Sequence, residues 1–406
     1  MLTSAPVVRI LVAKGVRAFG DGFVSLLLPL YLLDLGFGPM QVGIIATATL
    51  LGSGLLTLAI GLHAHRWHYR TLLIAAAVLM AATGIGFAFV RDFWPLLVIA
   101  IVGTLNPSSG DVSVFLPLEH AAMSRMVSDQ ERTAAFARYS LVGATFAALG
   151  SLAVALPSTL AALTGFSARA SLQSMFLLYA VLAVLAGLAY RGLPGSQSVD
   201  ATRKLAPLRE SRKRVYTLAA LFSLDAFGGG FVVQSMVALW LYQRFGVSLE
   251  WVGTIFFWTG LLTAASYLVA VRIAKRIGLV NTMVFTHLPS SLCLILIPFM
   301  PEVGWVVALL FVRSALSQMD VPTRSSYVMA IVPPAERPAA ASVTSVPRSL
   351  ASAASPVLAG YLLSLSTFGW PLLAAGGLKI LYDLLLLAYF RNVRPPEEAN
   401  PPQSRR

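Results

Sequence analysis

The hexapeptide AFGDGF occupies Ala18–Phe23, and a close copy, AFGGGF, occupies Ala226–Phe231. One such match can arise by chance, but others follow in the same order along the chain. Self-similarity at a nearly constant spacing is typical of a chain built from equivalent structural units. The repeat therefore predicts two related halves. The further matches are Val42-Gly43 with Val252-Gly253, Ala64-His65-Arg66 with Ala274-Lys275-Arg276, and Glu131-Arg132-x-Ala-Ala with Glu336-Arg337-x-Ala-Ala.

The composition indicates that these halves lie in a membrane. Hydrophobic residues make up 57% of the 406 residues and charged residues only 12%, whereas soluble domains carry about 25% charged residues. Apolar runs close to the roughly 20 residues that span a bilayer recur along the chain. They do not alternate apolar with polar residues as barrel strands do. The sequence predicts an all-α integral membrane protein, and its first run, which lacks a cleavage site, is expected to be a membrane helix rather than a signal peptide.

Twelve transmembrane helices are predicted, in two bundles of six related by pseudo-two-fold symmetry. Residues 1–190 form the first bundle, 191–216 a basic linker, 217–391 the second bundle and 392–406 a short tail. The predicted helices are 7–33, 40–62, 71–90, 95–118, 134–157, 171–190, 217–242, 249–271, 280–300, 304–332, 338–363 and 371–390.

The distribution of basic residues sets the expected orientation. With the N-terminus in the cytoplasm, most of the 30 lysines and arginines lie on cytoplasmic segments or helix ends. The outer loops hold only Arg91, Arg169 and Arg244. Cytoplasmic loops of membrane proteins are enriched in Lys and Arg, so both termini are expected inside. Because its basic residues flank membrane helices, the net charge of +13 does not indicate a nucleic-acid partner.

Two six-helix repeats joined by a basic cytoplasmic loop resemble the major facilitator superfamily over nearly the whole chain. The family's loop after the second helix reads G-x-x-x-D-R-x-G-R-R/K, and this chain has GLHAHRWHYR at Gly61–Arg70. The first glycine and both arginines are kept, but the aspartate is His65 and the second glycine is His68. The resemblance implies a secondary transporter that binds its substrate at the membrane midplane between the two halves. A latch that relies on the missing aspartate is not expected.

Asp21 is the first candidate functional residue. A carboxylate near the centre of a membrane helix costs roughly 2.5–3.5 kcal/mol to insert and persists where it meets water, a partner or a proton. Arg17 lies one helical turn earlier, so a same-helix ion pair is possible. The repeat places Asp225 opposite Arg17, so the charges of the two halves are exchanged. Asp21 is either a substrate or proton site or one partner of a structural pair.

Other polar residues in the predicted spans widen the candidate set. The stretch Asn106–Asp111 breaks the fourth helix, and unwound backbone at membrane depth is tolerated only against protein or a water-filled cavity. Asp320 and Arg324 have the i, i+4 spacing of residues on one helix face. Small residues over Ala351–Gly360 surround Pro356 and indicate either a bend or close helix packing. The candidates for substrate or proton coupling are Asp21, Arg17, Asn106, Asp111, Asp225, Gln234, Arg313, Asp320 and Arg348.

A second set of charges is expected to form a gate. When the halves are aligned on Glu131 and Glu336, Glu119 falls on Arg324, and both lie near cytoplasmic helix ends. Opposite charges at equivalent positions could bond across the halves in the outward-open state. The alternative is local pairing: Glu119 with Arg125 or Arg138, and Arg324 with Asp320. Arg66 and Arg276, which follow the second helix of each half, are further gate candidates.

Histidines and cysteine suggest no metal site or cofactor. The three histidines His63, His65 and His68 share a short loop without a nearby carboxylate or Cys, whereas zinc sites need three or four ligands in defined geometry. His287 is expected to be a packed, uncharged residue, and Lys379 with Asp383 a structural i, i+4 pair. The single Cys293 permits no intramolecular disulfide.

The leading interpretation is a proton-coupled secondary transporter that exports a drug or metabolite by alternating access. Proton-coupled uptake of an anionic metabolite, read by Arg17, Arg313 and Arg348, is the alternative. The chain has no phosphate-binding loop, so ATP is not expected to drive transport directly. A membrane-embedded enzyme is a remote alternative, because no G-x-S-x-G or H-E-x-x-H motif is present. A scaffold is equally remote, because such a protein usually carries a large soluble domain or a long tail. The expected partners are the lipid bilayer, a small solute and protons. The expected form is a monomer, and the expected location a bacterial inner membrane.

Overall fold

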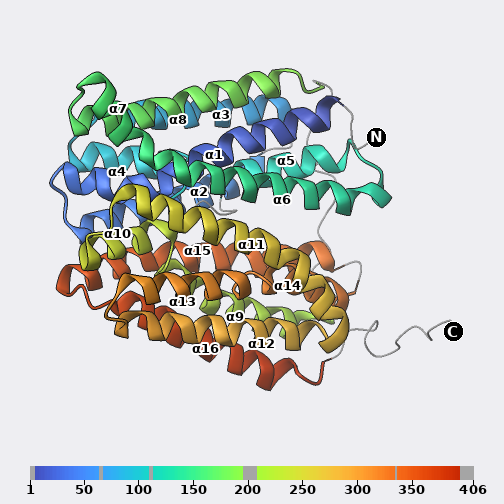
Figure 1. The fold of residues 1–406 in the computed structure, drawn as a ribbon. Helices are drawn as coiled ribbons and strands as arrows, with labels where there is room; N and C mark the ends of the chain where they lie inside the picture. The colour runs from blue at the N-terminus through green and yellow to red at the C-terminus, as the bar shows by residue number, and fades with distance from the viewer. Residues whose placement is uncertain (1–4, 64–66, 109–112, 195–207, 334–335, 394–406) are drawn as a thin grey trace. The chain divides into compact units, whose positions relative to one another are not determined.

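The structure is a computed structural model that describes residues 5–63, 67–108, 113–194, 208–333 and 336–393. The regular elements in these ranges are helices that follow one another with short connections (Figure 1). In the first half they are α1 (Ala5–Asp34), α2 (Pro39–His63), α3 (Tyr69–Phe89), α4 (Phe93–Val102), α5 (Phe115–Ser124), α6 (Asp129–Leu152), α7 (Leu156–Thr164) and α8 (Ala168–Arg191). In the second half they are α9 (Arg212–Gly230), α10 (Gln234–Phe245), α11 (Leu249–Ile277), α12 (Leu279–Leu296), α13 (Val303–Leu316), α14 (Asp320–Ile331), α15 (Arg337–Leu365) and α16 (Trp370–Phe390).

Within the described ranges, 9 helical stretches are long and apolar enough to cross a membrane. Three of the predicted spans are interrupted. The fourth is divided between α4 and α5, the seventh between α9 and α10, and the tenth between α13 and α14. The polar stretch that begins at Asn106 accounts for the first break, because Pro107 cannot donate a hydrogen bond to the helix ladder. The fourth and tenth helices are equivalent members of the repeat, and both are broken.

Contacts between residues divide the chain into two compact units, and α11 and α15 each contribute to both. The first unit comprises Met1–Thr202, Val233–Leu261 and Pro356–Thr367. The second comprises Arg203–Val232, Leu262–Ser355 and Phe368–Arg406.

In the first unit α1 is the central helix and packs against α6, α8 and α10. Its crossing with α6 depends on two glycines. A Cβ at Gly22 would overlap the carbonyl oxygen of Ala147, and one at Gly150 would overlap that of Phe19. Small residues permit such close approach of membrane helices. The glycines of AFGDGF are thus explained in part by helix packing.

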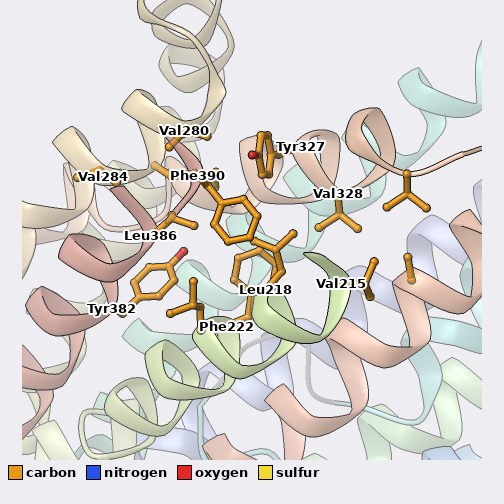
Figure 2. Packing of buried hydrophobic residues seen from close by; sticks show 14 residues of the cluster. Val215, Leu218, Phe222, Val280, Val284, Tyr327, Val328, Tyr382, Leu386 and Phe390 are labelled. Atoms are coloured by element: carbon orange, nitrogen blue, oxygen red, sulfur yellow. The ribbon is translucent and has the colours of Figure 1, made fainter. Parts of the chain in front are cut away.

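The second unit is built around α9, α12 and α16. Its apolar core receives side chains from these helices and from α14, as Figure 2 shows. The ring centroids of Tyr327 and Phe390 lie 6.1 Å apart, and those of Phe222 and Tyr382 lie 6.4 Å apart. The fully buried members include Val215, Leu218, Met283, Val284, Tyr327, Ala340, Tyr382 and Leu386.

Equivalent contacts recur in the two units, as a duplicated fold requires. The sequence repeat pairs Gly22 with Gly230, and a Cβ at Gly230 would overlap the carbonyl oxygen of Ser352, which is the equivalent of Ala147. Where Gly150 meets the Phe19 backbone, its equivalent Ser355 donates a hydrogen bond of 2.6 Å to the Phe227 carbonyl. The small residues near Pro356 therefore serve close helix packing.

Candidate functional site

The first unit contains a buried ion pair between α1 and α5. Arg17 Nη2 lies 2.5 Å from Glu119 Oε2, and the guanidinium stacks over the Phe115 ring at 3.8 Å. Two tyrosines complete the arrangement. The Tyr139 hydroxyl donates to Glu119 Oε2 at 2.5 Å. The Tyr190 hydroxyl donates to Glu119 Oε1 at 2.6 Å and accepts from Arg17 Nε at 3.0 Å.

We call Arg17, Glu119, Tyr139 and Tyr190 the first charge cluster. All four residues are at most 2% exposed. Buried charges are stable only when they are paired and their remaining hydrogen-bonding groups are satisfied. Every carboxylate oxygen of Glu119 has at least one donor, so this cluster meets that condition. Glu119 pairs with Arg17, and neither Arg125 nor Arg138 is its partner.

Asp21, one turn after Arg17, has a different environment. It is partly exposed, and its Oδ1 accepts from the Tyr179 hydroxyl at 3.3 Å. The same hydroxyl lies 3.4 Å from the Thr104 carbonyl oxygen, so one donor is shared between two acceptors. Arg17 pairs with Glu119 and not with Asp21, so the possible same-helix ion pair is not formed. Among the described residues, the hydrogen-bond partner of Asp21 is the Tyr179 hydroxyl.

The second unit contains a larger group of buried charges. Asp225 on α9 accepts from Lys379 Nζ at 2.7 Å through Oδ1 and from Arg324 Nη2 at 2.9 Å through Oδ2. Arg324 also pairs with Asp320, one turn earlier on α14, as the local alternative for Arg324 predicted. Its guanidinium lies 5.0 Å from the centroid of the Phe222 ring.

His287 on α12 connects this network to α16. Its Nδ1 lies 3.0 Å from both carboxylate oxygens of Asp383. Its Nε2 lies 3.5 Å from Lys379 Nζ and 3.6 Å from Asp225 Oδ1. We call Asp225, His287, Asp320, Arg324, Lys379 and Asp383 the second charge cluster, and every member is at most 8% exposed.

The expected pair of Lys379 with Asp383 is wrong. The long lysine side chain reaches Asp225 on α9, while Asp383 faces His287 on α12. His287 is buried, as expected, but it lies between two carboxylates and an ammonium group and is no ordinary packing residue. Sequence spacing showed that Lys379 and Asp383 share a helix face, but it could not show which neighbouring helices carry their partners.

The two clusters are related by the repeat with their charges exchanged. Arg17 of α1 corresponds to Asp225 of α9, and Glu119 of α5 corresponds to Arg324 of α14. Each unit thus joins the same two equivalent helices by an arginine–carboxylate pair of opposite direction. The sequence indicated the exchange at Arg17 and Asp225 but not the pairing of each with its own unit.

Comparison with known proteins identifies the family to which this architecture belongs. The family model described as Major Facilitator Superfamily matches residues 10–312 and 218–406. The chain belongs to the major facilitator superfamily. It is 25% identical over 414 residues to an uncharacterized membrane protein of Saccharomyces cerevisiae, covering 93% of this chain and 92% of that one.

Solved structures of superfamily transporters have the same fold. A structure of a mutant form of the nucleoside transporter NupG matches with a TM-score of 0.75 and 13% identity, and covers 95% of this chain and 100% of that one. A bacterial homologue of the human lysosomal transporter Spinster, in an inward-facing and occupied conformation, matches with a TM-score of 0.74 and 13% identity over 94% of each chain. This superfamily member is therefore a multi-pass membrane transporter and not an enzyme.

The other candidate residues predicted from the sequence of this superfamily member lie outside the two charge clusters. In the first unit Gln234 Oε1 accepts from the Ser25 hydroxyl at 2.9 Å. Asn106 Oδ1 accepts from the backbone and side chain of Ser108, which holds the turn after α4. The carbonyl of Pro107 accepts from the Ser235 backbone amide at 3.1 Å, so the interruptions of the fourth and seventh helices bond to each other.

Three predicted arginines have no role in the two clusters. Arg313 on α13 is partly exposed, and its Nε is buried without a hydrogen-bond partner among the described residues. Arg348 lies on α15, and Arg276 is exposed near the end of α11. Asp111 and Arg66 lie outside the described residues. Among the described residues no group of histidine, cysteine and carboxylate side chains has an arrangement that could hold a metal ion.

Proposed function

We propose that the protein exports a small solute in exchange for protons, with Asp21 as the coupling carboxylate. The carrying observation is the position of Asp21 in α1. Among the described residues it accepts one hydrogen bond, from Tyr179, and forms no ion pair. Arg17, the nearest cation along the helix, is engaged by Glu119. Intramembrane carboxylates of this kind mark proton or substrate pathways.

Two further considerations support a coupled transporter. The superfamily's members couple substrate and ion movement through sites near the bilayer midplane. Asp21 lies about midway along the 30 residues of α1 and is partly exposed. Its protonated form could donate a hydrogen bond to Tyr179 or a substrate, and its ionised form only accepts. Loss of a proton therefore changes what Asp21 can bind.

The proposed location is a bacterial inner membrane, with both termini in the cytoplasm and a monomer as the working unit. The excess of basic residues on the predicted cytoplasmic side supports the orientation. Export as the direction rests on the resemblance of this chain to drug and metabolite efflux members of the superfamily.

Uptake of an anionic metabolite is a second candidate, and Arg313 favours it. A buried guanidinium nitrogen without a partner costs free energy unless a ligand or water satisfies it. Arg17 supports this candidate less, because its Nη2 and Nε already donate to Glu119 and Tyr190. Under this hypothesis Arg313→Gln removes transport of carboxylate or phosphate solutes and leaves transport of neutral solutes unchanged.

The test uses purified protein in proteoliposomes and a panel of drugs, nucleosides, sugars and organic acids. Solute counterflow identifies the substrate class without a proton gradient. An imposed pH gradient should then drive accumulation by the wild type. Asp21→Asn should keep counterflow and lose gradient-driven accumulation.

Asp34→Asn is the matched control for this experiment. Asp34 lies on the same helix but at its end, where it pairs with Arg169 at the surface. This variant should behave as the wild type does. If Asp21→Asn accumulates solute normally under a pH gradient, Asp21 is not the coupling group.

A further inference from the structure

His287 and Asp383 stand apart from the other charges of the second charge cluster. Arg324 and Lys379 are both cations, and both bind Asp225, while Arg324 also binds Asp320. These four residues contain two positive and two negative charges and are neutral together. Asp383 is 0% exposed, and among the described residues its ion-pair partner is His287. With a neutral imidazole and an ionised carboxylate, the pair carries one negative charge. It becomes neutral when it binds one additional proton.

We propose that His287 and Asp383 form a proton-binding site that controls the contact between Lys379 and Asp225. The site holds one exchangeable proton, taken from water and returned to water. This inference goes beyond the proposed function, because it concerns the second unit and does not depend on Asp21. It assigns a chemical role to α12 and α16, which the sequence analysis treated as structural.

The two ring nitrogens of His287 face different groups, and this geometry links protonation to Lys379. Nδ1 points to Asp383, and opposite an ionised carboxylate, which only accepts, it is the donor of that hydrogen bond. In the neutral ring Nε2 is an acceptor, and it faces the Lys379 ammonium at 3.5 Å. A proton added to Nε2 turns it into a cationic donor. The added charge repels Lys379 and attracts Asp225 Oδ1, which lies 3.6 Å away.

Protonation thus makes His287 a competitor of Lys379 for the same oxygen of Asp225. Lys379 now binds that oxygen at 2.7 Å. Charges at such distances in a poorly hydrated interior interact strongly, so one proton is sufficient to change which cation Asp225 holds. Because Asp225 belongs to α9, the change reaches a helix equivalent to α1.

Gly229 leaves room for the displaced lysine. Lys379 Nζ lies 3.8 Å from the position that a Cβ of Gly229 would occupy, and nothing else lies within 4 Å of that position. Gly229 is the residue of AFGGGF that replaces Asp21 of AFGDGF. A side chain there would compete with Lys379 for this space, so the glycine of the second copy permits the movement.

Other ionisable groups face the pair from the surrounding helices. After Asp383 the nearest groups are Lys379 and Asp225. The Tyr382 ring on α16 contacts the His287 ring edge-on at 5.9 Å between centroids. Arg313 on α13 forms no ion pair with a described residue, although its charge acts on Asp225. Among the described residues, the ionisable groups around the pair are Asp225, Arg313, Asp320, Arg324, Lys379, Tyr382 and Asp383.

The experiment is a pH titration of ¹⁵N-histidine-labelled full-length protein in lipid nanodiscs. The spectrum separates neutral from doubly protonated rings, and His287→Gln identifies the His287 signals by their loss. We expect the His287 ring to gain a proton as the pH is lowered across the range in which the protein stays folded. Lys379→Met should shift the midpoint, since it removes the cation that faces Nε2. His68→Gln, which changes an exposed histidine, should leave it unchanged.

Two results would overturn the proposal. One is a His287 ring that keeps a single protonation state across the range. The other is an unchanged titration in Asp383→Asn, which removes the carboxylate that stabilises the cationic ring. If that variant does not fold, Asp383→Glu takes its place and should shift the midpoint while retaining the titration. Asp21→Asn should titrate as the wild type does, so failure of this proposal and failure of Asp21 as the coupling group are separate outcomes.

Discussion

Arg17 and Asp225 occupy the same position of the repeat with opposite charges, and each has found a partner of opposite charge at a second equivalent position. The exchange preserves the pairing while reversing its direction. Two identical halves would carry the same residue, either arginine or a carboxylate, at each pair of equivalent positions. With the exchange, α1 and α9 present different charges although they share a fold.

The first charge cluster makes a prediction at the level of a single residue. Glu119→Gln leaves the Arg17 guanidinium buried without a counter-charge, and removing one partner of a buried pair costs about 3–5 kcal/mol. We expect a clear fall in the thermal unfolding temperature of the purified protein. Glu302→Gln, at an exposed position, should change stability by no more than about 0.5 kcal/mol.

The double variant Arg17→Met with Glu119→Leu distinguishes a lost charge partner from general damage. Replacing a buried ion pair by apolar residues of similar volume is often neutral or stabilising. The double variant should therefore be more stable than Glu119→Gln alone. If it is less stable, the pair itself and its two tyrosines hold the helices together.

At the scale of elements, the glycines of the repeated hexapeptide set how closely helices cross. Gly22 and Gly150 bring the backbones of α1 and α6 together, and Gly230 does the same for α9 and α15. The nearest neighbours that a Cβ at Gly22 or Gly150 would meet are backbone atoms, which cannot rotate away as a side chain can. A substitution must therefore separate the helices.

Gly22→Ala should destabilise the protein for this reason, by about 1–3 kcal/mol, the usual cost of overpacking a close contact. Gly54→Ala is the matched control, because Gly54 also lies within a helix, α2, but has nothing within 4 Å of its Cβ position. Alanine is the better helix former of the two residues, so this variant should be as stable as the wild type or slightly more stable. Equal thermal stability of the two variants would contradict the packing argument.

The beginning of α9 depends on a residue that is distant in sequence. Glu336 Oε1 accepts from the backbone amides of Arg209 and Glu210 at 2.9 and 3.1 Å. Its Oε2 accepts from the amide of Ser211 at 3.2 Å and from the Ser211 hydroxyl. These donors hold the pKa of the Glu336 carboxyl at about 2, below its ordinary value of 4.5. Glu336 therefore caps α9 from outside the helix.

The pH dependence of this cap has a definite sign. A carboxyl whose pKa is lowered by folding adds stability above its unfolded pKa of about 4.5, and this stability is lost as the pH falls toward about 2. The protection factor of the amides of residues 209–211, the ratio of the intrinsic exchange rate at the same pH to the observed rate, should therefore be high at neutral pH and fall over that range. Glu336→Gln should exchange faster already at neutral pH, while Glu210→Gln, an exposed change, should not. A wild type and a Glu336→Gln variant with equal exchange at neutral pH would exclude the cap.

Much of the whole fold could be predicted from the sequence, because the periodic apolar runs and the repeat are properties of long segments. The all-helical membrane fold and the superfamily are confirmed. The charge sites were predicted less completely. Asp320 with Arg324 was within reach, since both lie on one helix at i, i+4. The contacts of Glu119 with Arg17 and of His287 with Asp383 join distant segments, and helix spacing alone does not say which faces meet.

The gate between Glu119 and Arg324 stays a prediction. Each of these residues has a partner within its own unit, so a bond between them would need both local pairs to break. Exchanging the two charges in a double variant, Glu119→Arg with Arg324→Glu, should restore transport lost in the single reversals if they meet. If the double variant transports no better than the single variants, Glu119 and Arg324 do not meet, and each serves only its local ion pair.

The orientation of the molecule is the last property that the sequence predicts and that labelling can test. Basic residues are concentrated on the segments assigned to the cytoplasm, and only Arg91, Arg169 and Arg244 lie in the outer loops. Cys293 is the single cysteine and is buried, so Cys293→Ser provides a background without thiols. On this background Ser198→Cys should react with a membrane-impermeant maleimide only in inverted vesicles. Ser248→Cys, in the exposed connection between α10 and α11, should react only in intact cells. Reaction of Ser198→Cys from outside intact cells would reverse the predicted topology.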